Sequence, residues 1–260
     1  MNALSNSGIG CANLTITVPD RKLIDGLQLK AAPGEFIAVL GPNGVGKSLA
    51  LHALAGVRTP DAGTITVAGS DLSSLTRQQV ALSIGLLPQY TEDFFPATVF
   101  DTVMIGRHPH IGRLRWESDE DFGIARQSLK DVDLAEFTDR DVLTLSGGER
   151  RRLAVAQVLT QSPHIFLLDE PTNHLDPQHQ LDVLKIFRRL ADDGKTVLAS
   201  LHDVNLAARF ADRCLLLFGD GRWKVGAITD VLHSDELSDL YHTPMETIPW
   251  KDLKLFVASG

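Results

Sequence analysis

The sequence predicts an α/β fold built on a mostly parallel β-sheet, and three observations support this prediction. Short apolar runs that suit strands buried on both faces occur at residues 36–40 and 165–168. Segments with helical spacing separate such runs, as at 147–161. The length of 260 residues suits one large α/β domain with a smaller subdomain. Strands that alternate with helices form parallel sheets with both faces covered.

The order of the predicted elements divides the chain into a core, an insertion and an extension. Alternating apolar residues at 14–18 predict a half-buried strand, and further strands are expected at 27–31 and 63–67. We expect these three strands to belong to an N-terminal antiparallel β subdomain. Helices predicted to begin near Thr98 and Ser118 indicate a helical subdomain inserted into the core. Further strands are expected at 84–87, 197–201 and 214–218, further helices after Ser48, Asp176 and Asp203, and an exposed loop at 108–121. The predicted bounds are 12–90 and 145–218 for the core, 91–144 for the helical subdomain and 219–260 for the C-terminal extension.

The composition is that of a globular protein and argues against several functions. Hydrophobic residues make up 43% of the chain and charged residues 22%, which suffices for a buried core. The net charge of -8 disfavours a nucleic-acid partner. Residues 1–10 have no signal-peptide pattern, and no run approaches the ~20 apolar residues of a membrane helix. Cys11 and Cys214 show no metal or disulfide spacing, so we expect both to be buried thiols.

A glycine-rich loop after the strand at 36–40 has the pattern G-x-x-x-x-G-K-[ST]. It consists of Gly41, Pro42, Asn43, Gly44, Val45, Gly46, Lys47 and Ser48. Glycines let successive N–H groups surround phosphate oxygens, and the following helix N-terminus adds positive charge. Lys47 can neutralise the β- and γ-phosphates, and the Ser48 hydroxyl can ligate Mg²⁺. A chance glycine turn is the alternative, but the strand before and the helix after disfavour it. We therefore expect a P-loop NTPase (RecA-like) core that binds ATP and Mg²⁺.

The strand at 165–168 ends in two carboxylates, Asp169 and Glu170. Ligands of open α/β sheets bind at the carboxyl ends of strands. Asp169 is expected to hold Mg²⁺, directly or through water, and Glu170 to polarise the attacking water. The alternative is a pair of solvated or helix-capping acids, and the phosphate loop in the same chain disfavours it.

Residues 145–149 have the sequence L-S-G-G-E. Ser146 and Glu149 alone form a capping box, while Gly147 and Gly148 leave N–H groups open for a second anion site. The two interpretations are compatible. The motif resembles the signature sequence of ABC transporter ATPases, and the resemblance covers nearly the whole chain in the order of the family's motifs.

The resemblance implies further site residues. Gln89 resembles the glutamine of the Q-loop, which contacts Mg²⁺ and links the nucleotide to the helical subdomain. Asp176 belongs to a segment that resembles the D-loop, and His202 resembles the switch histidine, which contacts the γ-phosphate. Leu49 stands where a second hydroxyl residue is common. Val18 stands where the family often has an aromatic residue, which implies an apolar contact with adenine in place of stacking.

The resemblance also implies partners. The family works as a head-to-tail pair, so each ATP would lie between Lys47 of one copy of a homodimer and residues 146–148 of the other. Residues 107–110, 173–176 and 201–208 resemble the importer branch for vitamin B12, siderophores and haem (type II), with cobalamin slightly favoured by general similarity. That branch implies a dimeric membrane permease, an indirect periplasmic or extracellular substrate-binding protein, and a peripheral location on the cytoplasmic face of the cell membrane.

Two other functions stay open from the sequence. A soluble ABC-type ATPase could act on a macromolecular assembly, such as an iron–sulfur scaffold, without a permease. A regulator that binds nucleotide without hydrolysis is disfavoured because Glu170 and His202 are both present.

Overall fold

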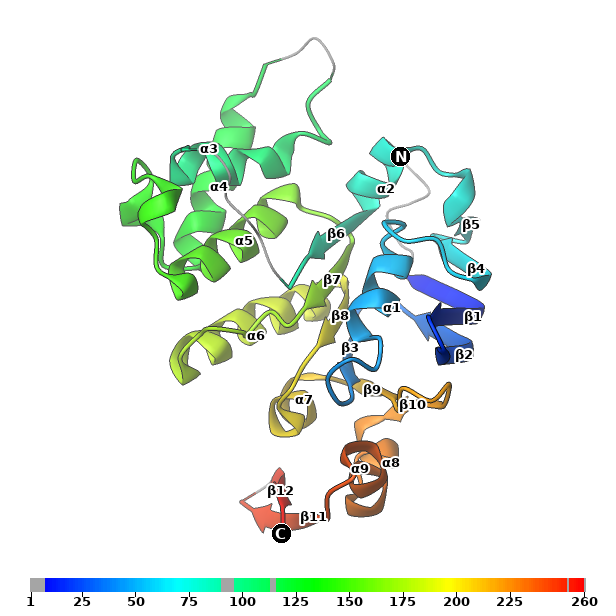
Figure 1. Cartoon of the computed structure of the whole chain (residues 1–260). Coiled ribbons are helices and arrows are strands. Elements are labelled where there is room, and N and C mark those ends of the chain that lie inside the picture. Colours follow the sequence, from blue (N-terminus) through cyan, green and yellow to red (C-terminus); the bar gives the residue numbers. More distant parts are fainter. Residues whose placement is uncertain (1–7, 90–95, 113–115, 252, 260) are drawn as a thin grey trace.

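The computed structural model describes residues 8–89, 96–112, 116–251 and 253–259 (Figure 1). The strands are β1 (Ile9–Val18), β2 (Arg21–Ala31), β3 (Phe36–Leu40), β4 (Ala62–Val67), β5 (Ser70–Asp71), β6 (Ile84–Leu87), β7 (Ile165–Asp169), β8 (Thr196–Ser200), β9 (Arg213–Leu217), β10 (Trp223–Ala227), β11 (Met245–Trp250) and β12 (Leu253–Ala258). The α-helices are α1 (Lys47–Leu54), α2 (Arg77–Ser83), α3 (Val99–Met104), α4 (Asp119–Asp131), α5 (Gly147–Gln161), α6 (Pro177–Asp192), α7 (Val204–Phe210), α8 (Ile228–Val231) and α9 (Ser234–Tyr241).

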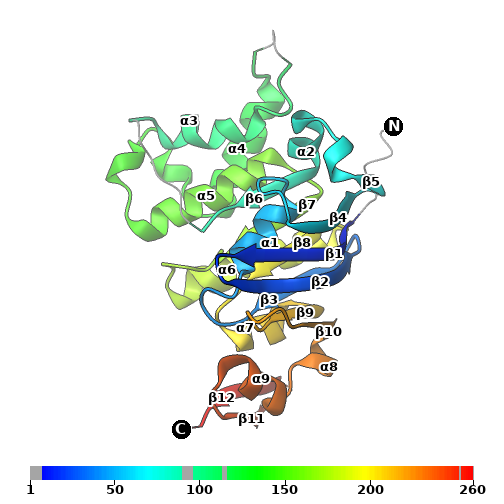
Figure 2. The same ribbon diagram turned by 45° about the vertical axis from the view of Figure 1, so that its right-hand side comes forward.

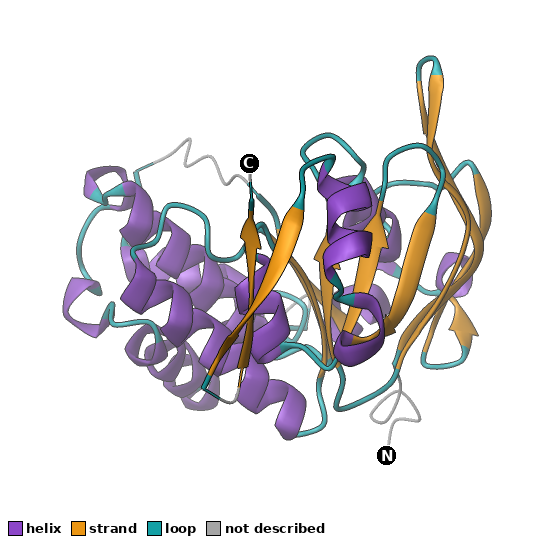
Figure 3. Ribbon diagram, turned by 90° about the horizontal axis from the view of Figure 1, so that it is seen from below, coloured by secondary structure: helices purple, strands orange, loops and turns teal. Residues whose placement is uncertain are grey.

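The strands of the described residues form a main sheet, an N-terminal sheet and a hairpin. The main sheet has the order β10-β9-β3-β8-β7-β6, and only β10 runs antiparallel to its neighbour. The N-terminal sheet is antiparallel and has the order β2-β1-β4-β5. Figure 3 shows most helices on one side of the molecule and most strands on the other. These features confirm the predicted α/β class with its antiparallel N-terminal part.

The main sheet is covered on both faces, and β3 shows how its sequence meets that requirement. All five residues of β3 are buried. Phe36, Ala38 and Leu40 belong to the larger core, which lies against α5, α6 and α7. Ile37 and Val39 belong to the second core, which α1 and the N-terminal sheet complete. Successive side chains of a strand point to opposite faces, so a continuous apolar run is what a strand with two covered faces requires.

Most predicted elements are confirmed, with ends that differ by a few residues. The strands at 36–40 and 84–87 have the predicted bounds, and Thr98, Ser118 and Asp203 cap helices as expected. Helix α2 and the elements of the extension were not predicted. Both cysteines are free and buried, as expected. Parts of the predicted 91–144 and 219–260 segments lie outside the described residues, and the domain bounds stay a prediction.

The expectation of an exposed loop at 108–121 is wrong at its C-terminal end. Helix α4 begins at Asp119, and Asp121 is buried. The Arg107 Nε donates to the Asp121 Oδ1 at 2.7 Å, so the pair joins the end of the preceding 3-10 turn to the start of α4. A buried carboxylate with a bonded cation avoids the cost of an isolated buried charge.

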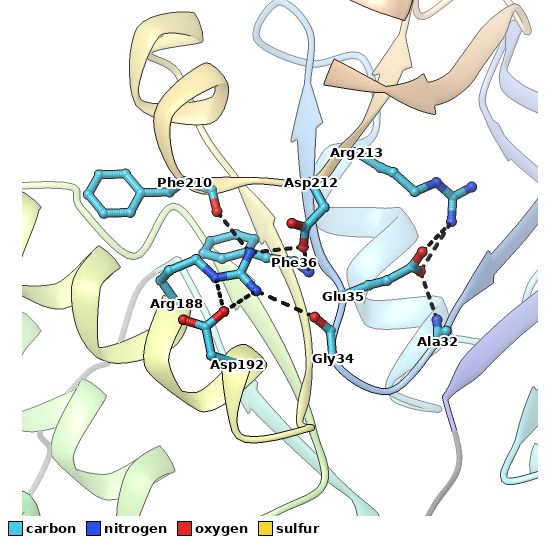
Figure 4. A network of polar contacts seen from close by, with 9 residues as sticks. All are labelled: Ala32, Gly34, Glu35, Phe36, Arg188, Asp192, Phe210, Asp212 and Arg213. Atoms are coloured by element: carbon cyan, nitrogen blue, oxygen red, sulfur yellow. Dashed lines mark hydrogen bonds and ion pairs between the residues drawn. The ribbon is translucent and has the colours of Figure 1, made fainter. Parts of the chain in front are cut away.

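A polar network lies at the edge of the main sheet where β3 and β9 begin (Figure 4). Arg188 of α6 donates to the Asp212 carboxylate at 2.8 Å, and the same carboxylate accepts the Phe36 N–H at 2.8 Å. Next to it, Arg213 pairs with Glu35 at 3.2 Å. These contacts fasten α6 to the amino ends of β3 and β9, and leave the opposite, carboxyl edge of the sheet for a ligand.

The C-terminal segment lies at one end of the molecule, far from α3 and α4 (Figure 2). Within the described ranges, no helix is both long and apolar enough to cross a membrane.

Candidate nucleotide site

The glycine-rich loop lies between the end of β3 and the start of α1, as predicted. Gly41 and Gly46 have φ values of 151° and 104°, which side-chain-bearing residues rarely adopt. A Cβ atom at Gly41 would lie 2.3 Å from the Leu217 carbonyl oxygen, so the loop leaves no room there for a side chain. The first turn of α1 contains no acidic residue, which keeps its N–H groups suited to an anion.

Lys47 is buried inside this loop. Its Nζ donates to the carbonyl oxygens of Gly41 at 2.7 Å and Pro42 at 3.0 Å. Burial lowers the pKa of Lys47, and the nearby charges of Glu170 and Asp169 oppose that shift. An ammonium group that is bonded to neutral carbonyls can exchange them for phosphate oxygens.

A cleft of about 530 Å³ opens over the loop. Among the residues that line it are Lys47, Ser48, Gln89, Glu170, Asn173 and His202. The predicted residues Asn43, Gly44, Gly46 and Leu49 also line it. Val18 lies at the same cleft, as the expected adenine contact requires, together with Arg21 and Leu23. The structure therefore brings residues from four separate sequence motifs to one place.

Asp169 lies at the end of β7 and is almost fully buried. The Ser200 hydroxyl donates to its Oδ1 at 2.7 Å. Its Oδ2 is buried and has no hydrogen-bond partner among the described residues. A buried carboxylate oxygen without a partner fits a cation held directly or through water. The described residues contain no group of three or more acidic, histidine or cysteine side chains that could hold a metal alone. Mg²⁺ sites on nucleotides do not need one, because water and phosphates supply most ligands.

Glu170 has a left-handed backbone, with φ of 50°, which turns its side chain into the cleft. Its Oε2 accepts from the Gln89 Nε2 at 2.8 Å and from the Asn173 Nδ2 at 2.7 Å. Its Oε1 lies 2.7 Å from the His202 Nε2. Three side chains from three loops therefore hold one carboxylate.

Two polar residues of this arrangement were not predicted, Asn173 and Ser200. The Ser200 hydroxyl donates to Asp169 and accepts the Glu170 N–H at 2.8 Å, so it orients both acidic residues. Ser200 is paired with Asp169 across β7 and β8. A polar residue at the end of an apolar strand was the signal in the sequence, but its neighbour becomes visible only with the sheet order.

The 146–149 motif begins α5 and forms the expected capping box. The Ser146 Oγ accepts the Glu149 N–H at 3.3 Å, and the Glu149 carboxylate accepts the Ser146 N–H at 2.6 Å. Ser146 and Gly147 are exposed, and a Cβ atom at Gly147 would meet nothing within 4 Å. Asp176 caps α6 and is also exposed.

The cleft that contains Lys47 is not lined by any residue of these two helix starts, namely Ser146, Gly147, Gly148, Glu149 and Asp176. Pro42, Val45 and Gly41 support the loop without lining the cleft. One subunit therefore presents the cleft with Lys47 and the exposed tip of α5 at two separate places.

Comparison with known proteins shows the family. The model of a family described as ABC transporter matches residues 24–173. The chain belongs to the ABC transporter family. A hemin import ATP-binding protein of Rhizobium meliloti is 37% identical over 241 residues, which cover 90% of each chain. A cobalamin import ATP-binding protein of Halobacterium salinarum is 38% identical over 226 residues, but this chain spans only 56% of that protein.

Solved structures agree with this assignment. A metal-chelate type ABC transporter in an inward-facing conformation is 30% identical, with a TM-score of 0.85 and 98% of both chains covered. A dimeric bacterial ABC transporter cassette is 27% identical, with a TM-score of 0.74, and covers 85% of this chain and 98% of its own. Membership of the ABC family confirms the predicted P-loop NTPase fold and ATPase activity.

Proposed function

We propose that this ABC ATPase powers an importer that takes up a metal-chelate-type nutrient, such as haem, cobalamin or siderophore-bound iron. The observation that carries the proposal is the separation of the cleft from the helix tip. Lys47 and Glu170 meet in one cleft, whereas Ser146 and Gly147 face solvent from the start of α5. Two copies placed head to tail would complete both sites, and the names of the relatives support an importer for such cargo.

In this mechanism, Lys47 exchanges its loop carbonyls for the β- and γ-phosphates of ATP. Ser48, Gln89 and Asp169 would hold Mg²⁺, which neutralises phosphate charge when it is bound with the nucleotide. Val18 would contact the adenine. Positioning and charge stabilisation contribute most to phosphoryl transfer, because its transition state is loose.

Glu170 would act on the attacking water. The carboxylate orients the water and accepts its proton as the water oxygen bonds to the γ-phosphorus and the bond to the β-phosphate oxygen breaks. Gln89, Asn173 and His202 hold that carboxylate in the cleft. With ATP present, His202 would turn to the γ-phosphate, which frees one carboxylate oxygen for the water.

The helix tip would bind the nucleotide of the second subunit. Residues 146–148 would contact the terminal phosphate of ATP in the partner's cleft, with Glu149 keeping the tip capped and Asp176 beside the seam. ATP closes the pair because it contacts both subunits, and hydrolysis with phosphate release removes that contact.

A second groove, which shares no lining residue with the cleft, would receive the permease. It has a volume of about 890 Å³ and lies among α1, β4 and α2. Val57 on its rim is 69% exposed, and the apolar side chains of Leu72, Val80 and Leu86 line it. Leu86 belongs to β6, two residues before Pro88 and three before Gln89, so a segment bound in the groove lies close to the chain that leads into the cleft. The ATPase would then sit peripherally on the cytoplasmic face of the membrane, and a substrate-binding protein would act through the permease.

Co-expression with permeases from adjacent genes tests the proposal. The wild-type chain should co-purify with one permease and support uptake of haem, cobalamin or a siderophore complex. Val57→Glu should abolish co-purification while ATP binding persists. Ile248→Glu, which changes an exposed apolar residue on the β11–β12 hairpin, is the matched control and should behave as wild type. Binding to a soluble assembly and to no permease would contradict the importer and favour the alternative ATPase.

A further inference from the structure

Arg151 is a buried cation on α5 to which the mechanism above gives no part. The residue is 4% exposed. Its guanidinium group donates hydrogen bonds to four backbone carbonyl oxygens. The Nη1 donates to Pro88 at 2.6 Å and to Gln89 at 3.3 Å, and the Nη2 donates to Asp169 and, at 2.8 Å, to Glu170. These carbonyls lie where β6 and β7 end, at the carboxyl edge of the sheet.

A guanidinium is suited to this position. Its planar fork presents two nitrogen atoms at fixed geometry, so it can hold the ends of two neighbouring strands at one spacing. Burial lowers the pKa of Arg151 to about 10, while the charges of Asp169 and Glu170 oppose the shift. The group is therefore still a cation at neutral pH, and it lies beside two carboxylates to which the proposed mechanism gives a role.

The helix that carries Arg151 begins at the exposed tip. Ser146 caps α5, and Arg151 follows five residues later, about 7.5 Å along the axis at 1.5 Å per residue. The first turn also rests on the segment after Glu170, because a Cβ atom at Gly148 would lie 3.3 Å from the His174 carbonyl oxygen. Helix α5 therefore contacts the Glu170 backbone through Arg151 and the segment after Glu170 through Gly148, all within one subunit.

We propose that Arg151 is a positioning residue that transmits engagement of the helix tip by the partner's ATP to Glu170 and Gln89 of its own site. ATP bound at one site would shift α5 of the opposite subunit, and Arg151 would carry that shift to the carbonyls beside the second catalytic carboxylate. The two sites of the pair then hydrolyse ATP cooperatively. This inference rests on the head-to-tail pair of the proposed function.

Arg151→Gln and Arg151→Lys test the inference in the purified full chain. We expect kcat to fall by up to about 10²-fold, the cost of misplacing a reacting group by about 1 Å, and the Hill coefficient for ATP to fall from above 1 towards 1. The KM for ATP should stay within about twofold, because uniform binding of the nucleotide by Lys47 is retained. Lysine keeps the positive charge but lacks the planar fork. Arg151→Lys should therefore be more stable than Arg151→Gln, while its Hill coefficient should stay low.

Arg152→Gln is the matched control. Arg152 is the next residue of the same helix and also donates to backbone carbonyls, at Val132 and Asp133, but these lie away from the cleft. Its Hill coefficient should equal that of the wild type. Thermal unfolding of all variants separates a loss of stability from a loss of coupling.

Two results would overturn the inference. One is an Arg151→Gln protein with wild-type kcat and Hill coefficient. The other is a fall in kcat with an unchanged Hill coefficient, which would make Arg151 a structural residue only. ATP-dependent dimerisation in a Glu170→Gln background distinguishes this failure from failure of the proposed function: Arg151→Gln should still dimerise there. If the chain with an unaltered cleft and helix tip does not dimerise in the presence of ATP, the proposed function and the inference are both overturned.

Discussion

At the scale of single residues, the site depends on one carboxylate and the groups that hold it. The sequence predicted Glu170, Gln89 and His202 from motif order, and the structure brings Gln89 and His202 within hydrogen-bond distance of the Glu170 carboxylate. Asn173 and Ser200 escaped prediction because amides and hydroxyls are common in loops. Their role depends on the left-handed turn at Glu170 and on the pairing of β7 with β8, which no local pattern encodes.

Glu170→Gln tests the assigned residue. The amide keeps the shape of the side chain but cannot accept the proton of the water, so we expect a loss of turnover on the order of 10²–10⁴-fold. ATP binding should persist, and the ATP-bound pair should become longer-lived because the nucleotide is not consumed. Steady-state hydrolysis and nucleotide binding are the measurements. Glu136→Gln, at an exposed position, serves as the control, and unchanged turnover in Glu170→Gln would remove the assignment.

At the scale of elements, local signals determined what could be predicted. Capping residues and apolar runs located most helices and strands of the core. The helix start near Ser118 was predicted, but residues up to 121 were also expected to be exposed because they are polar, whereas Asp121 is buried against Arg107, fourteen positions away. A contact between residues fourteen positions apart leaves no periodic pattern in the sequence by which it could be predicted.

Asp121→Asn tests this contact through its pH dependence. Bonds from Ser118 and the charge of Arg107 lower the pKa of Asp121 to about 2, below about 3.9 for an unfolded chain. The carboxylate therefore stabilises the fold above pH ~4, and that stabilisation is lost as the pH falls from ~4 towards 2. We expect Asp121→Asn to lower the free energy of unfolding by roughly 2 kcal/mol at pH 7.

Urea unfolding between pH 7 and pH 3 measures the difference between the two proteins. The difference in the free energy of unfolding between the wild type and Asp121→Asn should be constant from pH 7 to pH 5 and should become smaller below pH ~4. A difference that narrows with rising pH would contradict the sign of the shift. Asp119→Asn, in the same helix turn but exposed, should show a much smaller effect.

At the scale of the whole molecule, the C-terminal extension is part of the main core. Leu237 and Leu240 of α9 are fully buried in the larger cluster, with Phe256 of β12. The Asn205 side chain, on α7, donates to the Phe256 carbonyl at 3.1 Å and accepts its N–H at 2.8 Å. The sequence left this segment unplaced, because its elements are short and its contacts reach back to α7, next to the loop of His202.

Leu240→Ala should therefore destabilise the whole chain. Removal of a fully buried leucine side chain costs about 2–5 kcal/mol, depending on how far the cavity collapses. Chemical unfolding followed by circular dichroism measures the loss. Leu143→Ala, at a leucine that is 43% exposed, should change the free energy of unfolding by less than about 1 kcal/mol. Equal losses in both variants would show that the extension is not packed into the core.

In the proposed pair, two copies of this chain hold ATP at their seam, with the lysine-bearing loop of one facing the helix tip of the other. A crystal structure of the Glu170→Gln chain with ATP and Mg²⁺ tests it most directly. We expect a dimer in which the Ser146 hydroxyl and the Gly147 and Gly148 N–H groups of one copy lie within hydrogen-bond distance of the γ-phosphate held by Lys47 of the other. Nucleotide bound at Lys47 with residues 146–148 of both copies facing solvent would contradict it.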